Sequence, residues 1–83
     1  MSIVDERAEH YGPGDENLTR IARLWGAYLN KPITASDVCW MMVMLKASRA
    51  RIDVDHLDNY RDATGYIELA ERVRHTDRPS QRR

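Results

Sequence analysis

The sequence predicts an all-α fold, a small bundle of about four helices, one short N-terminal and three longer, completed by dimerisation. Apolar residues recur at helical spacing in two segments, and a capping signal precedes a third, apolar segment. Neither an internal repeat nor a β-hairpin signal interrupts this pattern. With 42% hydrophobic and 31% charged residues among 83, the chain is too apolar for general disorder and too charged to span a bilayer.

The first two predicted helices lie on either side of a glycine and proline break. Residues 3–10 are predicted to form a short helix that Ser2 caps, with acidic residues in its first turn. Residues 12–14 end it. A second helix begins at Asp15 or Asn17 and runs to about Leu29. Its apolar residues follow helical spacing: Leu18, Ile21, Ala22, Trp25, Tyr28 and Leu29.

The third predicted helix, residues 35–51, is the most apolar part of the chain. Thr34 and Asp37 have the spacing of a capping box, and residues 38–45 are apolar without interruption. A helix that is apolar on nearly every side must be covered on every side, which few helices in so small a domain can do. We therefore expect part of this block to pack against a second subunit. The residues predicted for core or dimer packing are Trp25, Trp40, Met41 and Met44.

The fourth predicted helix runs from about Asp58 to Arg74 and ends a single helical domain at residues 1–74. Residues 75–83 contain no apolar side chain and are predicted to be a basic, flexible tail. The formal net charge of zero conceals an asymmetry, since residues 1–71 carry 8 basic and 12 acidic groups and residues 72–83 carry 5 and 1. Such a basic tail is either simply solvated, or it contacts an external partner or the acidic body of the protein.

Opposite charges concentrate where the third and fourth helices meet. If these helices form an antiparallel hairpin, Lys46 and Arg49 lie opposite Asp58 and Asp62. Such a cluster can hold a phosphate on the basic groups, with Tyr66 as a further candidate, and Mg²⁺ on the carboxylates. The alternative is an ion-pair network that only fixes the hairpin.

The acidic residues near the N-terminus have both a metal-binding and a structural interpretation. Glu6 and Glu9, with Asp5, resemble half of an acidic metal motif, but an acidic first turn also stabilises a helix.

The single cysteine, Cys39, excludes an intramolecular disulfide, and the three histidines lack zinc-site spacing. No cofactor is predicted with certainty, and Mg²⁺ is expected only if the protein binds a nucleotide.

Residues 5–73 resemble a group of small phage and prophage proteins of unknown function in the identity and spacing of certain residues. That group is distantly similar to nucleotide-modification-associated domains and MazG-type all-α nucleotide pyrophosphatases. The residues that carry the resemblance are Tyr11, Gly12, Asn17, Ile21, Ala22, Leu24, Trp25, Tyr28, Leu29, Ile33, Asp37, Val38, Met41, Met42, Leu45, Lys46, Arg49, Asp58, Asp62, Gly65 and Tyr66.

The MazG-type resemblance implies Mg²⁺-dependent hydrolysis of nucleoside triphosphates, with the metal on a Glu-Glu-x-x-Glu and a later Glu-x-x-Asp motif. Asp5, Glu6 and Glu9 correspond to the first motif and Asp62 to the last aspartate. The second motif is incomplete, since Asn59 stands three residues before Asp62.

These observations leave three hypotheses for the function. The first is a phage-type protein that acts by binding, as a homodimer, on a host or phage protein in the host cytoplasm. The second is a Mg²⁺-dependent nucleotide-binding protein or a reduced pyrophosphohydrolase. The third and weakest is a nucleic-acid accessory protein that uses the arginines of residues 72–83. We expect binding rather than catalysis, and neither nucleic acid nor membrane as the main partner.

Overall fold

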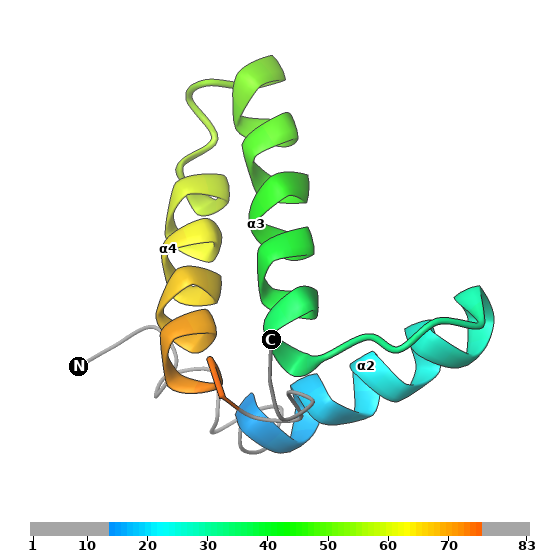
Figure 1. The fold of residues 1–83 in the computed structure, drawn as a ribbon. Coiled ribbons are helices and arrows are strands. Elements are labelled where there is room, and N and C mark those ends of the chain that lie inside the picture. The colour runs from blue at the N-terminus through cyan, green and yellow to red at the C-terminus, as the bar shows by residue number, and fades with distance from the viewer. Residues whose placement is uncertain (1–13, 76–83) are drawn as a thin grey trace.

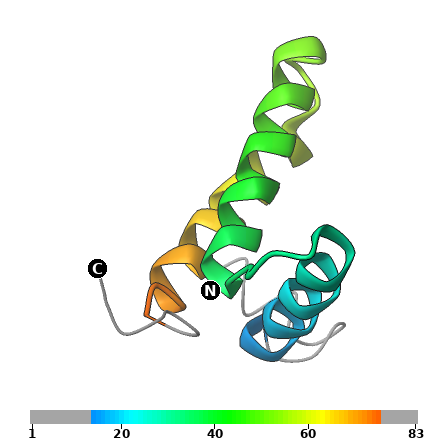
Figure 2. The same ribbon diagram turned by 45° about the vertical axis from the view of Figure 1, so that its right-hand side comes forward.

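A computed structural model describes residues 14–75, which form three helices and no strand. Helices α3 (Ala35–Ile52) and α4 (Leu57–Arg72) form an antiparallel hairpin, and α2 (Gly14–Leu29) crosses the N-terminal end of α3 (Figure 1). The view in Figure 2 shows α2 projecting away from the hairpin. The all-α prediction is confirmed. The predicted helix at residues 3–10 and the predicted tail beyond residue 75 lie outside the described residues.

The end of α2 is set by one residue with a left-handed backbone. Asn30 has a φ of 56°, and the Lys31 N–H donates to the Gly26 carbonyl at 3.0 Å. This is the geometry of a Schellman motif, which satisfies a carbonyl that the helix end leaves without a partner. The chain then turns back along α2 and reaches the start of α3.

The start of α3 confirms the predicted capping box. The Thr34 hydroxyl accepts from the Asp37 N–H at 3.0 Å, and the Asp37 carboxylate accepts from the Thr34 N–H at 2.9 Å. Both interactions satisfy donors of the first turn, which have no partner inside the helix. Asp37 is therefore a structural residue as well as an exposed one.

The turn between α3 and α4 differs slightly from the prediction. Helix α4 begins at Leu57, with His56 in the N-cap position and no side-chain capping bond. The turn is fastened from α4 instead, since the Tyr60 hydroxyl donates to the Val54 carbonyl at 2.9 Å. We call residues 52–57 the hairpin tip.

The core lies at the end of the hairpin where the three helices meet. Small side chains, Ala22 of α2, Ala35 and Cys39 of α3 and Ala70 of α4, let the backbones approach closely. The other buried apolar residues of this cluster are Leu18, Val38 and Val73. Over residues 14–75, no helix combines the length and apolar character needed to cross a bilayer.

We predict that Gly26→Ala destabilises the protein. A Cβ at this position would lie 2.9 Å from the Lys31 carbonyl oxygen and 3.7 Å from the Ile33 nitrogen, both backbone atoms. An unhindered glycine-to-alanine change in a helix stabilises by about 1 kcal/mol, whereas overpacking costs about 1–3 kcal/mol. Thermal unfolding followed by circular dichroism should show a lower Tm for the variant. A higher Tm would contradict the close approach.

Candidate functional site

The α3–α4 hairpin brings together two oppositely charged residues of the predicted site. The Lys46 Nζ lies 3.0 Å from the Asp62 Oδ2, and the two side chains are only 13% and 14% exposed. Asn59, one turn before Asp62 on the same side of α4, is also buried. This polar layer lies between the apolar core and the turn that joins the two helices.

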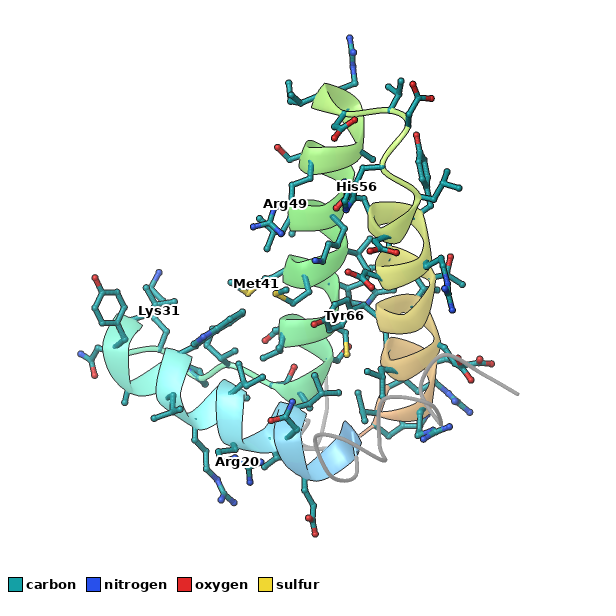
Figure 3. The ribbon with its side chains drawn as sticks, turned by 180° about the vertical axis from the view of Figure 1, so that it is seen from behind. Arg20, Lys31, Met41, Arg49, His56 and Tyr66 are labelled. Atoms are coloured by element: carbon teal, nitrogen blue, oxygen red, sulfur yellow. The ribbon has the colours of Figure 1, made fainter. Side chains whose placement is uncertain are left out.

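The other residues of the predicted phosphate site are less closely associated with this pair. The Arg49 side chain is exposed, and Figure 3 shows it on the side of α3 away from α4. Tyr66 lies one turn after Asp62 on α4 and is half-buried. The expected juxtaposition of Arg49 and Asp58 is not found among the described residues, because the Asp58 carboxylate lies 3.9 Å from the His56 Nε2 at the hairpin tip.

The residues predicted to bind Mg²⁺ do not form a cluster within the part of the chain that the structure describes. Residues 14–75 contain no group of three or more His, Cys, Asp or Glu side chains placed to hold a metal ion. Asp62 is paired with Lys46, and Asp58 is exposed near the tip. Glu6 and Glu9 lie outside the described residues. Mg²⁺ binding by the four carboxylates therefore stays a prediction.

The apolar block of α3 is divided between the core and the surface. Val38 and Cys39 are fully buried, whereas Trp40 is 50% and Met44 63% exposed. Met41 is also exposed, and Figure 3 shows it pointing into the angle between α3 and α2. Trp25 is only partly buried and packs against the core from α2. The described chain thus covers one side of α3 and leaves an apolar surface on the other, while packing against a second subunit stays a prediction.

Two further apolar groups are exposed besides the residues predicted for core or dimer packing. The hairpin tip carries Ile52, Val54 and Leu57, and α2 presents Leu24 and Tyr28 to solvent. The sequence signal for the exposed tip is the alternation of apolar and acidic residues at 52–58. The same alternation is typical of an ordinary polar turn, so it does not by itself predict an apolar surface. The sequence signal for the exposed residues of α2 is that its apolar side chains span more of the helix circumference than one packing partner can cover.

The fold and its surface define a small all-α protein, built on an antiparallel hairpin with a crossing helix and a large exposed apolar area. The chain belongs to the family described as a domain of unknown function (DUF6378), which matches residues 1–74. This agrees with the predicted resemblance to phage proteins of unknown function. The MazG-type resemblance is a separate and finer hypothesis, to which the family description adds nothing.

Two mycobacteriophage proteins are similar to the chain. It is 40% identical over 72 residues to the Gene 55 protein of Mycobacterium phage L5, a match that covers 86% of this chain and 46% of that protein. It is 37% identical over 71 residues to the Gene 55 protein of Mycobacterium phage D29, covering 86% and 47%. The chain thus spans about half the length of these curated relatives. No solved structure matches it.

We predict that Asp62→Ala destabilises the protein more than replacing both members of the Lys46–Asp62 pair. Removing the carboxylate leaves a largely buried ammonium without its partner, which costs about 3 kcal/mol, whereas an apolar pair of similar volume is often nearly neutral. Urea unfolding of Asp62→Ala, Lys46→Met and Lys46→Met with Asp62→Leu measures this difference. If the double variant were the least stable of the three, the Lys46–Asp62 pair would have a role beyond joining α3 to α4.

Proposed function

We propose that this chain is a phage-type protein that acts by protein–protein binding, as a homodimer that pairs through the exposed side of α3. The observation that carries this proposal is the continuous exposed surface on the side of α3 away from α4. We call it the outer face of α3. Its members are all exposed, and most of its central residues are apolar: Asp37, Trp40, Met41, Met44, Ala47, Ser48 and Arg51.

The size and chemistry of these side chains favour an interface. Single exposed apolar residues are common on protein surfaces, but a contiguous patch with charged residues at its margin is typical of a binding site. Burial contributes about 25 cal/mol for each Å² of apolar surface, and Trp40 and Met44 each offer large side chains. Methionine also conforms to irregular surfaces, which suits Met41 and Met44 to an interface.

A homodimer also accounts for how little of α3 the described chain covers. Buried residues of α3 are confined to its first turns, Ala35, Val38 and Cys39. A second subunit would cover the rest of the helix. We propose a host or phage protein as the eventual target of this homodimer.

We predict that the purified protein is a dimer at micromolar concentration and that Met44→Glu makes it a monomer. The glutamate places a charge at the middle of the outer face, where the partner would have to desolvate it. Light scattering coupled to size-exclusion chromatography measures the mass directly. The matched control is Ile67→Glu on α4, an exposed apolar residue on another helix, which should remain dimeric.

Circular dichroism should confirm that both variants keep their helical content, because each replaces an exposed side chain. A wild-type protein that stays monomeric at micromolar concentration would overturn the homodimer. Equal dissociation by both variants would mean that the outer face of α3 is not the interface.

A second candidate function, Mg²⁺-dependent nucleotide binding, is favoured by the presence of Lys46 and Arg49 on one helix, with the Asp62 carboxylate 3.0 Å from the Lys46 ammonium. Phosphate binding would require Lys46 to exchange this carboxylate for a ligand oxygen. Each nucleoside triphosphate can be tested alone and with Mg²⁺.

We predict a rise in Tm with nucleotide and Mg²⁺ together under this second function, and its loss in Arg49→Ala. Arg49 is exposed, so this variant keeps the fold. A ligand that binds only the native state stabilises by about 2.7 kcal/mol at 100 times its Kd. An unchanged Tm at millimolar nucleotide would remove this candidate and leave the binding protein.

A further inference from the structure

The outer face of α3 has a sequence pattern that is nearly symmetric about its centre. Asp37 and Arg51 each lie seven residues from Met44, at opposite ends of the face, and all three side chains are exposed. Seven residues are almost two helical turns, so both charges lie on the same side of the helix as Met44. Each is about 10 Å from it along the axis.

The residues between the two charges alternate in size about the same centre. Trp40 lies four residues before Met44 and Ser48 four residues after it. Met41 lies three residues before Met44 and Ala47 three residues after it. Each large side chain therefore has a small one at the equivalent position on the other half of the face.

From this pattern we propose that a second copy of the chain packs on the outer face of α3 antiparallel, with a two-fold axis at Met44. This inference rests on the homodimer proposed above and adds its orientation and register. A two-fold interface uses the same patch on both subunits, so each residue meets its symmetry-related position. In this register Trp40 of one copy meets Ser48 of the other, Met41 meets Ala47, and Asp37 meets Arg51.

The charges distinguish this orientation from the parallel one. Antiparallel packing forms the Asp37–Arg51 contact twice, once at each end of the interface. Parallel packing in register would place Asp37 against Asp37 and Arg51 against Arg51, and like charges in contact oppose association. The two large side chains, Trp40 and Met41, would also face their own copies in a parallel pair.

The same orientation explains the two exposed apolar groups outside the outer face. The hairpin tip lies at the C-terminal end of α3, and α2 lies at its N-terminal end (Figure 1). Antiparallel packing therefore carries the tip of each copy towards α2 of the other. Ile52 and Val54 at the tip would then meet the apolar arc of α2, where Tyr28 is 90% exposed. One stripe on one helix is smaller than the roughly 800 Å² that each partner usually buries, and this second contact enlarges the interface.

Cysteine cross-linking tests the register. Met44→Cys lies on the proposed axis, so two copies of this residue should oxidise to a disulfide within the dimer. Ser48→Cys lies opposite Trp40 and should not cross-link to itself, because the two Ser48 positions are about 12 Å apart along the axis. A mixture of Ser48→Cys with Trp40→Cys should form the disulfide. The wild type is the control for Cys39, which is buried.

The charges provide a test that keeps the interface apolar residues unchanged. Arg51→Glu places a glutamate opposite Asp37 at both ends and should weaken the dimer about tenfold, since each exposed pair contributes about 0.2–1 kcal/mol. Adding an equal amount of Asp37→Lys should restore association as a heterodimer, in which both end contacts are again opposite in charge. Asp37 also caps α3, so the readout is the Kd of the mixture rather than of Asp37→Lys alone.

Covalent dimers of Met44→Cys and of the Ser48→Cys with Trp40→Cys mixture, with none of Ser48→Cys alone, support the antiparallel register. Self-cross-linking of Ser48→Cys would show a parallel pair and overturn the register while the homodimer stands. A reduced Met44→Cys protein that is dimeric by light scattering but does not cross-link on oxidation would overturn it as well. A monomeric wild type overturns both the register and the homodimer.

Discussion

The structure depends on the meeting of three helices at one end of the α3–α4 hairpin. The small residues there let the helices approach closely, and Leu18, Val38 and Val73 fill the space between them. Among residues 14–75, the strongly buried hydrophobic side chains all belong to this end. Because the core lies at one end and on one side, the rest of α3 has apolar surface that nothing in the described chain covers.

Polar interactions also link the two helices of the hairpin beyond this core. The Lys46–Asp62 pair joins them between the core and the tip, and the Tyr60 hydroxyl holds the turn through the Val54 carbonyl. A largely buried ion pair contributes little net stability, because the desolvation of both charges opposes their attraction. It does make other registers of the hairpin costly, since a shift of α4 along α3 would leave both charges buried without a partner. The pair thus favours one geometry for the outer face of α3.

The binding proposal rests on the exposed surface and not on the family relationship. The chain belongs to a family described only as a domain of unknown function and is similar to about half of two mycobacteriophage Gene 55 proteins. The most distinctive feature of the described residues is an apolar face bounded by Asp37 and Arg51. The antiparallel pairing proposed for this face places all of its central residues in the interface. A partner of another shape would not need to contact all of them.

The sequence alone determined the three described helices and most of their ends, because these depend on local signals. The apolar spacing of α2, the capping box of Thr34 and Asp37 and the break at Asn30 operate within a few residues of each other. It also indicated the contact of Lys46 with Asp62, since an antiparallel hairpin with a short turn leaves few choices of register.

Tertiary structure alone decided which side of α3 is covered. Its apolar block has no dominant face, so the sequence could not distinguish Val38 and Cys39, which are buried, from Trp40 and Met44, which are exposed. It also decided that Asp58 lies near His56 rather than Arg49, because α4 begins at Leu57 and the turn sets the direction of its first side chains. Which residues of an apolar helix face solvent depends on where the other helices lie, and that is a property of the packing and not of local sequence.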